Sequence, residues 1–92
     1  MQLNTLAKQH IEFCKSKGLP IGKFDLAFVI SRIEIEVQET IEAFSQSDER
    51  VQEELVDVLL QTIQALAIID PDIESAIKRK IEINKKRVWK KK

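Results

Sequence analysis

Four carboxylates at matched spacing are the residues of this chain best placed to do chemistry. They form two pairs, Glu36-x-x-Glu39 and Glu54-x-x-Asp57. Side chains three residues apart share a helical face, so each pair presents two carboxylates side by side if its segment is helical. Two such helices packed together would bring all four to one spot. Because crowded carboxylates repel one another and divalent cations bind hard oxygen ligands, the pattern predicts a metal site and a phosphate-bearing substrate.

The elements that must position these pairs are helices. The recurrence of apolar residues predicts helices at about residues 4–16, 24–44, 48–69 and 71–88, with no strand pattern. We expect Gly18 to end the first helix, Ser47 to cap the third, and Asp70-Pro71 to begin the fourth. The short connection at residues 45–47 favours antiparallel neighbours. The predicted fold is all-α, an antiparallel helical bundle in a single domain over residues 1–92.

Apolar residues cover more surface than one small bundle needs. The second helix carries a regular stripe: Leu26, Ile30, Ile33, Val37, Ile41 and Phe44. From Val58 onward the third helix is apolar on more than one face, which is typical of a helix buried on two sides. A domain of this size buries only about 60–65% of its unfolded surface. We therefore expect oligomerisation to complete the bundle, as a homodimer or a dimer of dimers.

The charges sum to zero but are unevenly distributed. Residues 34–57 hold nine acidic side chains and one basic one, whereas residues 78–92 hold nine basic and one acidic. This suits a site for metal ions and polyanions, although solvated helix faces and a lysine-rich tail from about residue 85 account for most of these charges. A single cysteine excludes an intramolecular disulfide and a cysteine-based zinc site. The longest apolar run, residues 65–69, is too short for a bilayer, so we expect a cytoplasmic protein without membrane or nucleic-acid partners.

An E-x-x-E pair on a surface helix is a weak signal by itself, because Glu favours helices and most such pairs are solvated. Here no lysine or arginine follows Glu36, Glu39 or Glu54 at i+4 to pair with it. Both pairs also lie in helices rich in apolar residues, and the second directly precedes the all-round apolar stretch. These two features favour a site over solvated decoration.

At this point a family resemblance becomes specific. Glu36-x-x-Glu39, a gap of fourteen residues and the run from Glu54 to Leu60 resemble the signature of the MazG-like all-alpha nucleoside triphosphate pyrophosphohydrolases. Lys80-x-x-x-Asn84-x-x-Arg87 resembles a basic and amide motif on the last helix of many members, and its residues share one face. The resemblance covers roughly residues 30–89. Many members carry a further Glu just before the first pair, where this chain has Ile35, so metal stoichiometry stays open.

The resemblance implies cleavage between the α- and β-phosphates of (deoxy)nucleoside triphosphates, giving a monophosphate and pyrophosphate, for nucleotide-pool house-cleaning. It makes the four carboxylates ligands or near-ligands of Mg²⁺, with Mn²⁺ as a substitute, and gives one of them the attacking water. Lys80 and Arg87 would neutralise phosphate charge, and Asn84 would hydrogen-bond a sugar or phosphate oxygen.

Two further side chains and two rival functions stay open. His10 lies among apolar residues, and a core or interface histidine is favoured over a base-contacting one by about two to one. Trp89 either stacks on a nucleobase or covers the core at a helix end. One rival is a non-enzymatic helical interaction module whose acidic face docks a basic partner. The other is a pyrophosphohydrolase with a narrow substrate such as phosphoribosyl-ATP.

Overall fold

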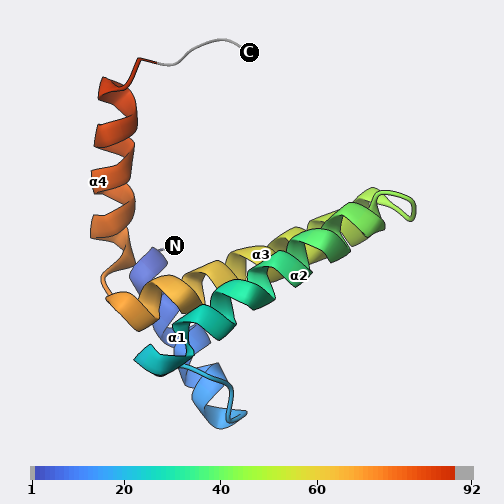
Figure 1. Cartoon of the computed structure of the whole chain (residues 1–92), viewed down its shortest axis with the longest axis horizontal. Helices are drawn as coiled ribbons and strands as arrows, with labels where there is room; N and C mark the ends of the chain where they lie inside the picture. The colour runs from blue at the N-terminus through green and yellow to red at the C-terminus, as the bar shows by residue number, and fades with distance from the viewer. Residues whose placement is uncertain (1, 89–92) are drawn as a thin grey trace.

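The structure, a computed structural model, consists of four α-helices joined by short connections (Figure 1). It describes residues 2–88; the predictions for Trp89 and the final lysines fall outside this range. The elements are α1 (Leu3–Ser16), the 3₁₀ turn η1 (Lys23–Asp25), α2 (Leu26–Ala43), α3 (Asp48–Ile69) and α4 (Ile73–Lys86). Within residues 2–88 there is no strand, so the all-α prediction is confirmed. No helix in this range is both long and apolar enough to cross a bilayer.

Two of the three predicted helix ends are confirmed. Gly18, just beyond α1, has φ of +67°, a left-handed conformation in which a side chain would be strained. The Ser47 hydroxyl accepts a hydrogen bond from the backbone N–H of Arg50 at 3.1 Å, which caps the first turn of α3. These two residues therefore set where α1 stops and where α3 starts.

The predicted start of α4 at Asp70-Pro71 is wrong by two residues. Asp72 is the N-cap, because its carboxylate accepts hydrogen bonds from the backbone N–H and the hydroxyl of Ser75, at 3.3 and 2.7 Å. Asp70 instead accepts a hydrogen bond from the backbone N–H of Asp72 at 2.9 Å, which shapes the connection. Asp72 rather than Asp70 is the N-cap, because only the Asp72 carboxylate reaches the backbone of the first helical turn.

The apolar core lies along the C-terminal half of α3. One cluster joins α1, α3 and α4 through Ala7, Ile63 and Ile73, with Leu3, Leu6 and Leu66 packed against it. The other joins α2 and α3 through Val29, Ala65 and Ile68, with Leu26 and Ile33 against it. Both clusters lie at the end of α3 nearer α4; among the described residues, the opposite end of the α2–α3 pair buries one apolar side chain, Ala43.

Polar contacts join the first turn of α4 to α1. Asn4 exchanges two hydrogen bonds with Glu74, through backbone N–H groups at 3.2 and 3.0 Å, and its side-chain amide donates to Asp72 at 3.0 Å. Hydrogen bonds from Asn4 and then Ser75 lower the pKa of Asp72. Beyond this turn α4 projects away from the α2–α3 pair (Figure 1). Its later turns are therefore open to solvent or to a partner.

Helices α2 and α3 lie side by side, joined by residues 44–47 (Figure 1). The buried residues of α2 are Val29, Glu36, Thr40 and Ala43, none of which belongs to the predicted apolar stripe, although Leu26 and Ile33 of that stripe pack against the core. Small side chains at Thr40 and Ala43 suit the close approach of two helices along this line. What we call the apolar row is consequently exposed; its members are 43–72% accessible and comprise Ile30, Val37, Ile41, Phe44, Leu55 and Leu59.

Candidate metal centre

Three carboxylates from two helices meet between α2 and α3. Glu36 of α2 and Glu54 and Asp57 of α3 each offer one oxygen, and these three atoms all lie within 4.8 Å of one another. Glu36 and Glu54 are each only 8% exposed, whereas Asp57 is exposed. The i, i+3 spacing within α3 places Glu54 and Asp57 on neighbouring positions of one face, and packing of α2 brings Glu36 to them. The structure thus brings together three of the four carboxylates singled out in the sequence.

The fourth, Glu39, is exposed and stands outside the three-oxygen group. It is still close enough for its charge to act on Glu36, one helical turn before it. Burial raises the pKa of the Glu36 carboxyl, and the negative charges of Glu39 and Asp57 raise it further, while the Arg32 guanidinium lowers it. Ionisation of all the carboxyl groups of the cluster is therefore disfavoured, and a cation bound among their oxygens would offset the repulsion between the negative charges.

Two arginines that the sequence argument missed accompany the buried glutamates. Arg32 Nη2 lies 3.6 Å from Glu36 Oε1, and Arg50 Nη2 donates a hydrogen bond to Glu54 Oε1 at 2.6 Å. Both arginines precede their glutamate by four residues, so a search confined to i+4 overlooks them. The spacing Arg-x-x-x-Glu, repeated in both helices, was the available signal. Arg50 also pairs with exposed Glu53, and these two contacts raise the pKa of the guanidinium.

The donor set fits a hard divalent cation. It offers carboxylate oxygens alone, two of them on residues that are only 8% exposed, and no histidine or cysteine belongs to this group. Oxygen ligands of this kind are what Mg²⁺ and Mn²⁺ bind, in contrast to the nitrogen and sulfur ligands typical of zinc. Glu36, Glu54 and Asp57 are therefore the residues that would hold such an ion.

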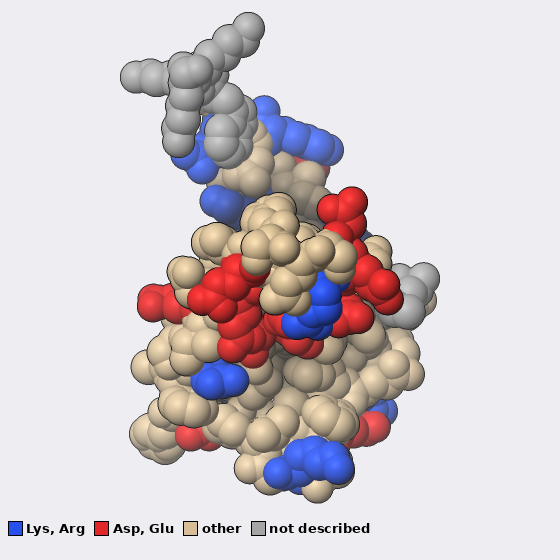
Figure 2. Space-filling view, turned by 90° about the vertical axis from the view of Figure 1, so that its right-hand side faces the viewer, with Lys and Arg blue, Asp and Glu red and all other residues tan. Residues whose placement is uncertain are grey.

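Open space adjoins one carboxylate of the group, Asp57. This hollow, of about 460 Å³, is lined by Arg50, Gln52, Glu53, Val56 and Asp57. A second hollow, of about 320 Å³, contains none of the carboxylates and is lined by Leu19, Pro20, Phe28, Val29, Arg32, Gln61 and Gln64. The Gln64 amide donates to the Pro20 carbonyl at 2.7 Å, which fixes the loop beside this hollow. Figure 2 shows acidic side chains gathered at this end of the molecule, with basic atoms among them.

The predicted substrate-binding motif of α4 lies elsewhere in the chain. Lys80 and Arg87 are exposed and Asn84 is half-buried. They lie on the part of α4 that projects away from the α2–α3 pair, and α4 packs on α1 and on the end of α3 (Figure 1). Within one chain, then, the structure does not bring this motif to the carboxylates.

His10 belongs to α1 and not to the acidic group. Its ring stacks on Phe13 with centroids 6.2 Å apart, and its Nε2 lies 3.7 Å from the sulfur of Cys14. Cys14 is fully buried, and burial raises the pKa of its thiol. Both contacts of His10 are to residues of its own helix, and its role in substrate binding stays a prediction.

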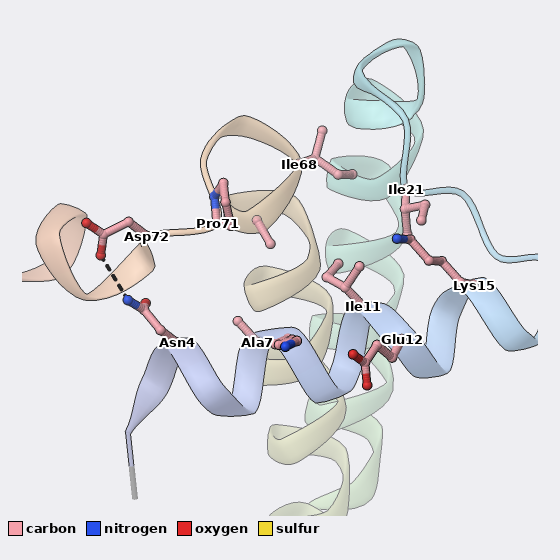
Figure 3. A pocket seen from close by; sticks show the side chains of 11 residues that line it. Asn4, Ala7, Ile11, Glu12, Lys15, Ile21, Ile68, Pro71 and Asp72 are labelled. Carbon is pink, nitrogen blue, oxygen red and sulfur yellow. Dashed lines mark hydrogen bonds between the residues drawn. The ribbon is translucent and has the colours of Figure 1, made fainter.

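A separate hollow of about 500 Å³ opens beside α1 (Figure 3). Apolar side chains, among them Ala7, Ile11 and Ile68, line most of it, while Glu12 and Lys15 stand along α1 (Figure 3). It contains none of the carboxylates of the acidic group.

Comparison of this chain with protein-family models, with curated proteins and with solved structures gives no match. Function is therefore inferred from the acidic group and its surroundings.

Proposed function

We propose that this protein is a Mg²⁺-dependent nucleotide pyrophosphohydrolase that converts (deoxy)nucleoside triphosphates to monophosphate and pyrophosphate. The observation that carries the proposal is the meeting of Glu36, Glu54 and Asp57 within 4.8 Å, from two helices, with two of the three buried. Burying a carboxylate is costly unless a charge compensates it. Arg32 and Arg50 compensate Glu36 and Glu54 in part, and a bound cation would compensate the remaining negative charge of the three carboxylates.

Each carboxylate has a role in this proposal. Glu36, Glu54 and Asp57 hold the cation, and Glu39, which stands outside the three-oxygen group, orients the attacking water and accepts its proton. Bound Mg²⁺ would offset the charge of the phosphates and lower the pKa of water. The hollow that Asp57 borders gives room for the polyphosphate, and the hollow that Arg32 borders gives room for the nucleoside.

The second part of the proposal is assembly through the apolar row. Each of its members follows a position of the α2–α3 contact by one residue, a rotation of 100° about its helix. Because the chain reverses at residues 44–47, both helices then direct these side chains to one side of the pair. Burial of this row against a second copy completes an antiparallel bundle, as a homodimer or a dimer of dimers.

Assembly also gives the α4 motif a function. In each copy α4 projects from the body with exposed Lys80 and Arg87, while the α2–α3 pair is acidic. This complementarity favours placing the basic helix of one copy beside the carboxylates of the other. There Lys80 and Arg87 would contact phosphate oxygens and Asn84 a sugar or phosphate oxygen. Because the proposed substrate is a nucleotide, we propose that the protein acts in the cytoplasm.

A direct test incubates purified protein with a panel of ribo- and deoxynucleoside triphosphates and Mg²⁺ and assays pyrophosphate. We expect release from at least one nucleotide and its loss on chelation of the metal. Glu39→Gln and Asp57→Asn should each lower kcat by at least ~100-fold, the effect typical of losing a positioned proton acceptor or an electrostatic group. Glu34→Gln, an exposed acid on the same helix as Glu39, is the matched control and should keep wild-type rates.

The outcomes separate the rivals. Wild-type turnover by Glu39→Gln and Asp57→Asn would remove the proposed site. No pyrophosphate from any nucleotide, with helical content and oligomer size intact, would favour the interaction module. Turnover restricted to phosphoribosyl-ATP would favour the narrow biosynthetic enzyme.

A further inference from the structure

The Arg50 side chain contacts one amide and two carboxylates. Its Nε donates to Gln46 Oε1 at 3.4 Å. Its Nη2 donates to Glu54 Oε1 at 2.6 Å, and its Nη1 pairs with Glu53. The two carboxylates differ, because Glu54 is buried and belongs to the three-oxygen group, whereas the Glu53 side chain is 54% exposed. The guanidinium therefore reaches from solvent to one of the carboxylates that would bind a cation.

A cation and this guanidinium compete for the same carboxylate. The side chain of Glu54 is only 11% exposed, so its oxygens face few partners besides Arg50 and the neighbouring carboxylates. A divalent ion among Glu36, Glu54 and Asp57 would also repel the positive charge of Arg50 at this short range. The other arginine is less firmly held, because Arg32 Nη2 lies 3.6 Å from Glu36.

We propose that Arg50 exchanges a carboxylate for a phosphate: it neutralises Glu54 in the metal-free protein, leaves Glu54 when a divalent cation binds, and then contacts the polyphosphate of the substrate. The inference rests on the proposed function and adds a phosphate-binding residue on the same chain as the carboxylates. Arg50 and Asp57 border the same hollow of about 460 Å³, so a released guanidinium faces space next to a metal ligand. A planar guanidinium binds phosphate through two parallel hydrogen bonds, a geometry that lysine lacks.

The exchange predicts two effects of opposite sign for Arg50→Gln. Without nucleotide, removal of the competing guanidinium should tighten Mn²⁺ binding by roughly fivefold, the ratio expected from a strong but partly exposed ion pair. With the site saturated by Mn²⁺, the same variant should bind a nucleotide analogue carrying a methylene bridge between its α- and β-phosphates about tenfold more weakly. Free Mn²⁺ is followed by electron paramagnetic resonance, and analogue binding by calorimetry.

Two further variants complete the design. Arg50→Lys keeps the positive charge, so it provides the test if Arg50→Gln does not fold. It should bind Mn²⁺ about as tightly as wild type does and should bind the analogue more weakly. Lys8→Gln removes one positive charge from the exposed side of α1 and should leave both affinities unchanged.

Tighter Mn²⁺ binding together with weaker analogue binding would support the exchange. Mn²⁺ binding by Arg50→Gln that is equal to or weaker than that of wild type would overturn it, as would unchanged analogue affinity in both Arg50 variants. A wild-type chain that binds no Mn²⁺ would overturn the proposed function itself, and the exchange with it.

Discussion

The two halves of α3 differ in the side chains that they bury. In the C-terminal half, Ile63, Ala65 and Ile68 are at most 8% exposed and pack on residues of α1, α2 and α4. One amide, Gln64, is buried among them. In the N-terminal half the buried residue is Glu54, while Leu55, the next residue, is 53% exposed. The C-terminal half thus buries mainly apolar side chains, whereas the N-terminal half buries a carboxylate and leaves a leucine exposed.

The residues that stabilise the fold and the residues proposed for chemistry therefore lie in different halves of α3. Apolar burial contributes most of the folding free energy, so the end of α3 near α4 is the stable end. The acidic end holds buried charge, which is stabilised by Arg32, Arg50 and the Ser47 cap rather than by an apolar core. Regions with few buried apolar contacts open at lower free energy, as sites that must admit a ligand generally do.

The largest effect should come from the apolar half. Ile63→Ala removes a side chain that is 2% exposed and leaves a cavity where α1, α3 and α4 meet, at an expected cost of about 2–5 kcal/mol. Leu59→Ala, one turn earlier and 50% exposed, should cost less than about 1 kcal/mol in the monomer. Urea denaturation at low protein concentration measures both. Equal losses would contradict the division between the two sides of α3.

The next effect concerns the apolar row of the acidic half. Ile41→Asp places a charge in the surface that we propose a second copy covers, and it should weaken self-association by at least about 2 kcal/mol. Sedimentation velocity across a concentration series should then show a monomer where wild type is a dimer or tetramer. Phe24→Asp is the control, because Phe24 is fully exposed but lies outside the row. If Ile41→Asp assembles like wild type, the row is not the interface.

A smaller effect should follow from the cap of the acidic half. Ser47→Ala removes the hydroxyl that accepts from the Arg50 N–H and should cost about 1 kcal/mol. Ser45→Ala removes a hydroxyl that only donates to the Glu42 carbonyl from the exposed connection, and should be close to neutral. Hydrogen exchange should show faster opening in the first turns of α3 for Ser47→Ala alone. Uniform acceleration along α3 would mean that the two halves open as one unit.

The sequence predicted correctly the helix ends that a few neighbouring residues determine. Gly18 and Ser47 lie where a left-handed residue and an N-cap were expected, and the α3 bounds agree with the predicted ones. It erred at the start of α4, where Asp70 and Asp72 both satisfy the rule and only the backbone path chooses between them. The cluster of Glu36, Glu54 and Asp57 was anticipated from spacing within each helix.

Packing between helices was the part that the sequence could not settle. A regular apolar stripe normally marks the buried face, yet here the α2–α3 contact uses Glu36, Thr40 and Ala43. Which of two faces meets the neighbouring helix depends on side-chain size and on a partner surface, neither of which periodicity reports. The two Arg–Glu pairs could be identified from their i−4 spacing, but their effect on the site depends on which glutamates are buried.

The smallest effect concerns the ionisation of Glu36. Its pKa is raised above the ordinary value of 4.5 by burial and by Glu39 and Asp57, so the folded state favours the protonated acid more than the unfolded state does. The stability that this preference contributes is complete below pH 4.5 and is lost as pH rises through the folded pKa.

Glu36→Gln cannot ionise, so at pH 7 and with chelator present it should exceed wild type in stability by less than about 1 kcal/mol, because the lost Arg32 pair offsets part of the relief. The difference should shrink as pH falls toward 4.5, and Glu34→Gln should show no such trend, since Glu34 is exposed. Denaturation across pH 4–8 measures it. A variant that is weaker than wild type at pH 7 would mean that Arg32 outweighs the burial and crowding of Glu36, and that the acidic half is held together by its ion pairs alone.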